Sequence, residues 1–216
     1  SRTMNTLLHV LEAYTELYRV DKTKKVGDYI KFMLDLFADR VYNQDLRRLD
    51  VFFDMDWNSI IDLHSYGHDI EASWLVDRAC EVLGDEEYTR KISKITKELA
   101  RKIYSVGLDE GASLYNECEN GKVDTKKVWW VQVEAIIGFV NGYEKDPSRT
   151  DYLETARKIW DYTKEYMIDK RADGEWFNEL YKDGSPIKEK EIVGPWKGPY
   201  HNGRMCLEMI NRNVEF

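Results

Sequence analysis

The chain has 216 residues, a formal net charge of −8 and 43% hydrophobic residues, enough for one sizeable domain or two small ones. The negative charge argues against nucleic acids and anionic membranes as partners, because both attract a basic surface. Three well-separated cysteines without a C-x-x-C pair, and the lack of an apolar run long enough to span a bilayer, predict a cytoplasmic protein with reduced thiols.

The hydrophobic pattern along the chain predicts an all-α protein. Apolar residues at three- and four-residue spacing begin with "MNTLLHVLEAY", close to the start of the sequence, and the same periodicity recurs six times. The expected helices are Thr3–Val20, Val26–Asp39, Gly67–Leu83, Glu86–Val106, Lys127–Tyr143, Arg149–Ile168 and Asn202–Asn211.

Three segments between these helices have the composition of short β-hairpins, because they mix aromatic residues with Asn, Asp and Gly. They are "RRLDVFFDMDWNSI" (47–60), "GASLYNECENGKV" (111–123) and "DGEWFNELYKDGSP" (173–186). The dipeptides Asn120-Gly121 and Asp183-Gly184 suit tight turns in the second and third hairpins.

The helices and hairpins recur as a repeat. Polar or aromatic residues open alternate helices at His9, His68, Trp130 and His201, with separations of 59, 62 and 71 residues. This spacing predicts helix pairs that either stack as an open solenoid or close into a double ring. Seven helices make three and a half pairs, so the sequence has the features of about half of such an array.

His68 and Glu71 are three residues apart and therefore share one face of the predicted helix. A carboxylate there can accept a hydrogen bond from one imidazole nitrogen and make the other nitrogen a better base. A surface ion pair without further function is the alternative interpretation of this spacing. Neighbouring Gly67 and Trp74, together with the preceding aromatic hairpin, make the functional interpretation as strong as the structural one.

A zinc site competes with this interpretation, because two imidazoles and a carboxylate form a known ligand set. His64, His68 and Glu71 would supply that set if the helix began early, but Gly67 between the histidines weakens the required helical register. No Cys, His or Asp cluster at ligand spacing completes the set downstream. We therefore expect no bound metal and no cofactor.

His201 lies where the segment "GPWKGPY" meets a predicted helix. Trp196 and Tyr200 beside it are of the type that stacks on sugars, and Trp130 lies one helical turn before Glu134. Aromatic faces with a polar rim are typical of a carbohydrate subsite, although core packing explains one of the tandem tryptophans equally well. Two separate histidines permit removal of a proton from one face of a carbon and its return to the other.

Four motifs together resemble the N-acylglucosamine 2-epimerase family. They are "MNTLLHVLEAY", "SYGHDIEASWL", "WWVQVEAIIGF" and "GPYHNGRMCLEM", in order along the whole chain. The resemblance implies an (α/α)6 barrel, hence a ring rather than a solenoid, and an isomerase of carbohydrate metabolism that inverts C2 of a reducing-end sugar through an enediolate. The form of "GPYHNGRM" favours members that act on β-1,4-linked disaccharides such as cellobiose and lactose.

The resemblance also implies roles for individual residues. His68 and His201 would be the general acid/base pair, with Glu71 as the partner of His68. The implied substrate-binding residues are Asn5, His9, Trp74, Trp130, Glu134 and Trp196. His64 is not expected to be catalytic.

Six helix pairs close the implied ring, about twice what this chain supplies. We therefore expect residues 1–216 to be the C-terminal portion of a single catalytic domain, inactive alone and prone to self-association through exposed apolar edges. An N-acylglucosamine 2-epimerase or an aldose–ketose isomerase of the same family would use the same bases. A non-catalytic helical module that binds carbohydrate or serves as a scaffold is the remaining alternative.

Overall fold

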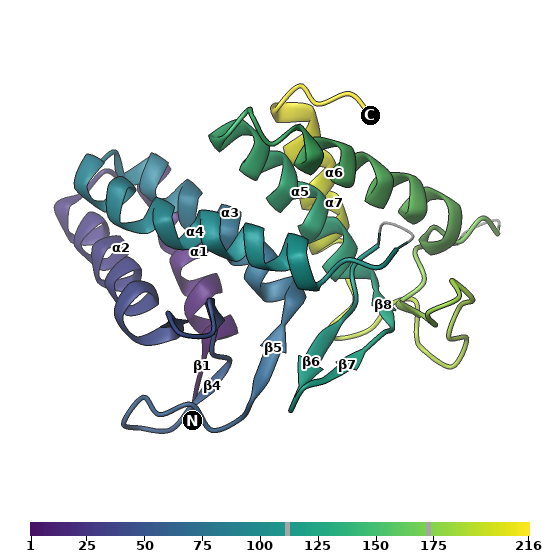
Figure 1. Cartoon of the computed structure of the whole chain (residues 1–216). Helices are drawn as coiled ribbons and strands as arrows, with labels where there is room; N and C mark the ends of the chain where they lie inside the picture. The colour runs from purple at the N-terminus through teal and green to yellow at the C-terminus, as the bar shows by residue number, and fades with distance from the viewer. Residues whose placement is uncertain (111–112, 172–173) are drawn as a thin grey trace.

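The computed structural model describes residues 1–110, 113–171 and 174–216, and its helices form two layers (Figure 1). The inner layer contains, side by side in this order, α1 (Met4–Val20), α3 (Tyr66–Leu83), α5 (Trp129–Lys145) and α7 (Tyr200–Asn211). The outer layer contains α2 (Lys24–Leu36), α4 (Glu86–Val106) and α6 (Thr150–Tyr162), each packed on the inner helix before it.

The burial pattern of each helix accounts for its layer. In α4 the buried side chains Ile92, Thr96, Leu99 and Ile103 recur at three- and four-residue spacing, and the opposite face is solvated. The central helices α3 and α5 are instead buried on nearly all sides, because they have neighbours in both layers. Polar residues within α3 and α5 are therefore forced to find partners inside the protein.

Short antiparallel strands gather at one end of the helices, below them in Figure 1. A three-stranded sheet contains β5 (Leu63–Ser65), β6 (Glu117–Glu119) and β7 (Lys122–Asp124). The two-stranded pairs are β1 (Arg2–Thr3) with β4 (Phe52–Phe53), β2 (Tyr42–Asn43) with β3 (Arg48–Leu49), and β8 (Lys127–Val128) with β9 (Glu179–Leu180). Strands β1, β5 and β8 lead directly into α1, α3 and α5, so three inner helices begin at this end.

The predicted helices are confirmed, with ends that shift by a few residues. The largest differences lie at the ends of α2 and α6, which each continue into a π-helical turn, η1 (Phe37–Val41) and η2 (Thr163–Met167). The predicted turn at Asn120-Gly121 is confirmed, with φ of 48° and 76° between β6 and β7. The turn at Asp183-Gly184 is confirmed as well, because the backbone N–H of Tyr181 donates to the carbonyl of Ser185 at 2.9 Å.

The predicted hairpin over residues 47–60 is confirmed in its second part, where Phe53 pairs antiparallel with Ser59 and the backbone N–H of Ile60 donates to the carbonyl of Phe52 at 3.0 Å. The strands of its first part have partners outside the hairpin. Strand β3 pairs backward with β2, and β4 pairs with β1 at the start of the chain. Local composition predicted the turn after β4, whereas the second partner of β4 is about fifty residues away in sequence. Residues 111–112 and 173, at the start of the other two predicted hairpins, lie outside the described residues.

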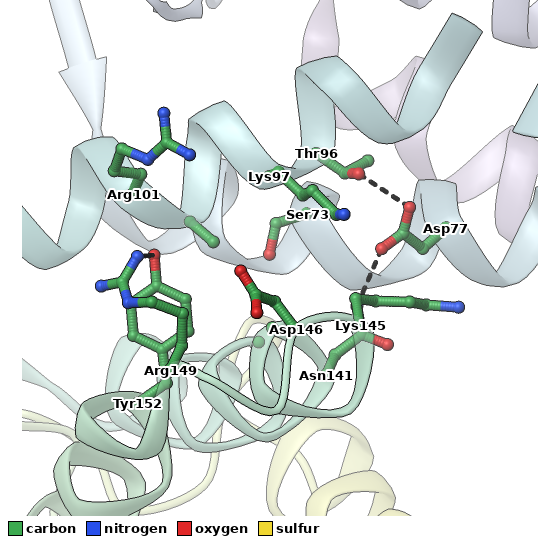
Figure 2. Close-up of a pocket in the computed structure, with 13 residues that line it drawn as sticks. Ser73, Asp77, Thr96, Lys97, Arg101, Asn141, Lys145, Asp146, Arg149 and Tyr152 are labelled. Atoms are coloured by element: carbon green, nitrogen blue, oxygen red, sulfur yellow. Dashed lines mark hydrogen bonds between the residues drawn. The ribbon is translucent and has the colours of Figure 1, made fainter. Parts of the chain in front are cut away.

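Buried polar contacts fasten α3 to its neighbours in both layers. The carboxylate of Asp77 on α3 accepts hydrogen bonds from Thr96 Oγ1 on α4 at 2.7 Å and from Asn141 Nδ2 on α5 at 2.9 Å (Figure 2). The adjoining cavity is only ≈ 30 Å³, so this interface is closely packed. The predicted site residues lie elsewhere in the fold.

Across residues 1–110, 113–171 and 174–216, none of the helices is both long and apolar enough to cross a membrane. The two layers of helix pairs agree with the expected all-α class, and closure of these pairs into an (α/α)6 ring stays a prediction.

Candidate active site

The first turns of the four inner helices surround a cavity of ≈ 460 Å³. Its lining residues are Asn5, His9, His68, Glu71, Trp129, Trp130, Gly194, Pro195, Trp196, Gly198, Tyr200 and His201. Helix N-termini carry partial positive charge and free backbone N–H groups, so the cavity favours a group that becomes negatively charged. The structure thus brings most of the predicted site residues to one place.

His68 lies in the first turn of α3, deep in this cavity. A hydrogen bond of 2.7 Å joins its Nδ1 to Oγ of Ser65, the residue that precedes α3. Burial, followed by the nearby His9 and His201, lowers the pKa of His68 to about 4. The ring is therefore neutral at pH 7, with Nδ1 engaged by a hydroxyl group.

Glu71 is fully buried and has a different partner from the expected one. Its Oε1 accepts a hydrogen bond from Nη2 of Arg204 at 2.6 Å, whereas the Nδ1 of His68 is bonded to Ser65. The expected pairing of Glu71 with His68 is corrected accordingly. Burial, followed by repulsion from Glu134, raises the pKa of Glu71 to about 7.

His201, the second residue of α7, has a buried carboxylate as its partner. Its Nδ1 lies 2.7 Å from Oε1 of Glu134 on α5. Burial acts to raise the pKa of Glu134, but the Arg204 guanidinium and the hydrogen bond from His201 outweigh burial, so this pKa lies below its ordinary value. An ionised Glu134 can only accept a hydrogen bond, so this contact orients the His201 ring with a proton on Nδ1.

Trp130 lies between the two histidines. Its ring centroid is 4.7 Å from that of His68 and 5.4 Å from that of His201. A glycine at position 67 makes this placement possible, because a Cβ there would lie 2.5 Å from Cη2 of Trp130. The indole therefore forms an aromatic floor that both imidazoles contact.

The two remaining predicted tryptophans differ in position. Trp74 is fully buried behind the cavity, where its Nε1 donates to Oε2 of Glu134 at 3.0 Å. Trp74 therefore supports Glu134, and the expectation that it contacts substrate is corrected. Trp196 is 93% exposed at the cavity rim, in a turn where Gly194 and Lys197 exchange two backbone hydrogen bonds of 3.0 Å.

Sequence reasoning missed Glu12 and Arg204. Glu12 on α1 lies 3.0 Å from Nδ1 of His9 and accepts from Oη of Tyr200 at 2.5 Å and from Nη1 of Arg204 at 2.6 Å. Burial acts to raise the pKa of Glu12, but its bond to His9 and the Arg204 charge lower it to about 2. The H-x-x-E spacing that marked residues 68 and 71 also occurs at 9 and 12, where it does form the pair.

The alternative zinc set of His64, His68 and Glu71 is not assembled. Nε2 of His64 is bonded to the buried carboxylate of Asp69 at 2.8 Å, and His68 is bonded to Ser65. Within the described residues, the cluster with metal-ligand spacing is Glu71, Glu134 and His201 instead. The guanidinium of Arg204 donates to both of these carboxylates.

Comparison with known proteins agrees with these motifs. The sequence model of the N-acylglucosamine 2-epimerase family (GlcNAc 2-epimerase) matches residues 1–203. A protein from Ruminococcus albus named cellobiose 2-epimerase is 49% identical over 214 residues, which cover 99% of this chain and 54% of the relative. The chain thus spans about half the length of the curated relatives it matches.

Solved structures give the same relationship. The structure of cellobiose 2-epimerase from Bacillus thermoamylovorans B4167 matches with a TM-score of 0.94 and 50% identity, covering 98% of this chain and 54% of that one. A D-mannose isomerase structure matches with a TM-score of 0.82 at 19% identity, covering 98% of this chain and 56% of that one, which shows a shared fold.

Proposed function

The chain belongs to the N-acylglucosamine 2-epimerase family, and from this membership we propose that the complete protein is a sugar 2-epimerase. Its proposed substrate is the reducing-end glucose of a β-1,4-linked disaccharide such as cellobiose or lactose, in line with the relatives named cellobiose 2-epimerase. Residues 1–216 are proposed as the C-terminal portion of its catalytic domain. The observation that carries the proposal is the pair of histidines that line one cavity and contact one indole floor.

The proposed reaction is a proton exchange at C2 of the open-chain sugar. The aldehyde at C1 acidifies the C2–H, one imidazole removes that proton, and the electron pair moves into an enediolate. The other imidazole then delivers a proton to the opposite face of C2, so one proton leaves, one arrives and the configuration inverts.

The surroundings of the histidines support one role for each. In one direction, neutral His68 acts as the base, and His201, which is hydrogen-bonded to Glu134, acts as the acid. In the reverse direction the roles exchange.

Other groups in the cavity fit a sugar and its developing charge. The buried Oδ1 of Asn5 has no hydrogen-bond partner within the described part of the chain, so it is an acceptor available to a hydroxyl group. His9, which lines the cavity, and the helix N-termini are the proposed stabilisers of the enediolate oxygens. Trp130 and Trp196 provide aromatic faces for the apolar faces of the sugar rings.

The test uses the full-length protein that contains this chain. We expect His68→Ala and His201→Ala each to lower kcat for C2 epimerisation of cellobiose by about 10²-fold or more, because each removes one proton-transfer group. Circular dichroism should show an unchanged helical content. Wild-type turnover in D2O should place deuterium at C2 of the product, detected by NMR.

The products separate the alternatives. A ketose as the main product would make the protein an aldose–ketose isomerase, and epimerisation without solvent exchange at C2 would exclude the enediolate route. A folded full-length protein that binds cellobiose without converting it would instead be a carbohydrate-binding module.

A further inference from the structure

We propose that Arg204 is a positioning residue whose guanidinium assembles the carboxylates behind the cavity and thereby orients His201. The proposal rests on the proposed epimerase function and adds a residue to its machinery. Arg204 lies on α7, three residues after His201, and reaches the other three inner helices.

The contacts of Arg204 are numerous for one side chain. Its Nη1 donates to Oε1 of Glu12 on α1 at 2.6 Å, and its Nη2 donates to Oε1 of Glu71 on α3 at 2.6 Å and to Oε1 of Glu134 on α5 at 2.7 Å. The guanidinium also lies 4.9 Å from the ring centroid of Trp74. A single cation therefore joins carboxylates from three helices.

Electrostatics explain why a cation is needed at this place. Glu71 and Glu134 are both fully buried, and carboxylate oxygens of the two lie within 4.8 Å of each other. Two buried carboxylates at this distance repel each other unless a positive charge lies between them. The same cluster has metal-ligand spacing, and the guanidinium lies within hydrogen-bond distance of both carboxylates. Arg204 thus supplies the positive charge from the chain itself.

The consequence for His201 follows from hydrogen-bond roles. Oε1 of Glu134 is hydrogen-bonded both to the guanidinium of Arg204 and to Nδ1 of His201. An ionised carboxylate can only accept hydrogen bonds, so a neutral His201 ring must carry its proton on Nδ1. Nε2 of His201 is then the nitrogen left to exchange a proton with substrate. Without Arg204, Glu134 would lose the charge that keeps it ionised, and this tautomer would lose its partner.

The chain offers a matched control. Arg78 on α3 forms an ion pair with Glu208 on α7 through two nitrogens, at 2.6 and 2.5 Å. It therefore joins α3 to α7 as Arg204 does, but its carboxylate partner is not bonded to a histidine of the cavity. A loss of helix–helix attachment alone should affect Arg78 and Arg204 variants alike.

The experiment compares Arg204→Met, Arg204→Lys and Arg78→Met in the full-length protein. The titratable groups bonded to Arg204 are Glu12 from α1, Glu71 from α3, Glu134 from α5 and Tyr200 from α7. His9 is bonded to Glu12, and His201 is bonded to Glu134. We expect Arg204→Met to lower kcat by about 10²-fold, with KM changed by less than about threefold. The acid limb of its kcat/KM profile should move to higher pH, because loss of the cation removes the charge that holds the pKa of Glu134 below its ordinary value.

Arg204→Lys should recover part of the lost kcat, since it keeps the charge but not the fork of donors. Arg78→Met should keep the wild-type pH profile, even if its melting temperature falls. If Arg204→Met is too unstable to assay, Arg204→Lys and rescue of Arg204→Ala by added guanidinium ion provide the same comparison.

A second measurement is independent of turnover. Two-dimensional ¹⁵N NMR of the imidazole groups should show Nδ1-protonated His201 in the wild type and in Arg78→Met, and a mixture of tautomers in Arg204→Met. The proposal is overturned if Arg204→Met retains the wild-type tautomer, kcat and pH profile. If the wild type does not epimerise cellobiose but Arg204→Met still changes the tautomer of His201, the epimerase function is contradicted and the positioning role of Arg204 is not.

Discussion

At the scale of single residues, the two histidines of the cavity differ in what they contact. His68 is bonded to the neutral hydroxyl of Ser65, and His201 is bonded to the carboxylate of Glu134. Burial keeps the His68 ring uncharged, whereas an ionised carboxylate fixes a proton on Nδ1 of His201. The different environments, and not the residue type, assign the two roles in the proposed reaction.

The lowered pKa of His68 predicts its titration. The pKa of about 4 lies below the ordinary value of 6.5, so between these values the unfolded chain binds a proton that the folded chain does not. The contribution of His68 to stability is therefore complete above pH 6.5 and is lost as pH falls toward 4. We expect imidazole ¹⁵N shifts to report a neutral His68 at pH 5, and urea unfolding to show a smaller pH dependence in His68→Gln.

His64 serves as the internal comparison in the same spectra, because it is bonded to the carboxylate of Asp69. A His68 midpoint near pH 6.5 would contradict the burial argument and remove the reason for treating His68 as the neutral base.

At the scale of elements, the first turns of α3, α5 and α7 form the site, and their closeness depends on a small residue. Gly67 on α3 lies against Trp130 on α5, so that the indole reaches both His68 and His201. Gly203 on α7 has open space where a Cβ would be. These two helical glycines therefore have opposite tolerances for a methyl group.

Substitution of these glycines tests the placement of the aromatic floor. Gly67→Ala puts a Cβ 2.5 Å from Trp130, so the ring must move, and we expect kcat of the full-length protein to fall by about tenfold or more. Gly203→Ala should keep wild-type kcat and gain up to about 1 kcal/mol of helix stability. The measurements are steady-state kinetics and urea unfolding, and equal kinetic effects of the two variants would contradict the packing argument.

At the scale of the whole molecule, the inner layer has two ends. Helices α1 and α7 flank the row α1–α3–α5–α7, and α7 presents Leu207 and Ile210 on one face with 61% and 69% of their surfaces exposed. Val20 at the end of α1 is also exposed. Neighbouring exposed apolar side chains of this size favour association in water.

The 216-residue chain alone is therefore expected to self-associate. Multi-angle light scattering in reducing buffer, required because Cys206 is exposed, should give a mass above that of one chain. The double substitution Leu207→Lys/Ile210→Lys should shift the mass toward the monomer, whereas Val193→Lys, at an exposed site in a loop, should not. A monomeric wild type across the accessible concentration range would refute this prediction.

Features that depend on neighbours along the chain could be predicted from the order of the amino acids. Helical periodicity predicted every inner and outer helix, and the Asn-Gly and Asp-Gly dipeptides predicted two turns, because backbone preference and burial of one face are local properties. The motifs also predicted that His68, Trp130 and His201 belong to one site, since each stands at the start of a repeated helix.

Contacts between side chains of different helices became known from the packing of the helices alone. Arg204 and Glu71 are 133 positions apart, and His201 and Glu134 are 67 apart. Periodicity tells which face of a helix is buried, but the side chain that meets that face comes from another helix and depends on packing. For that reason the sequence did not predict that His68 is bonded to Ser65 and not to Glu71. It also did not predict that Trp74 is bonded to Glu134 behind the cavity, or that Arg204 lies among the carboxylates.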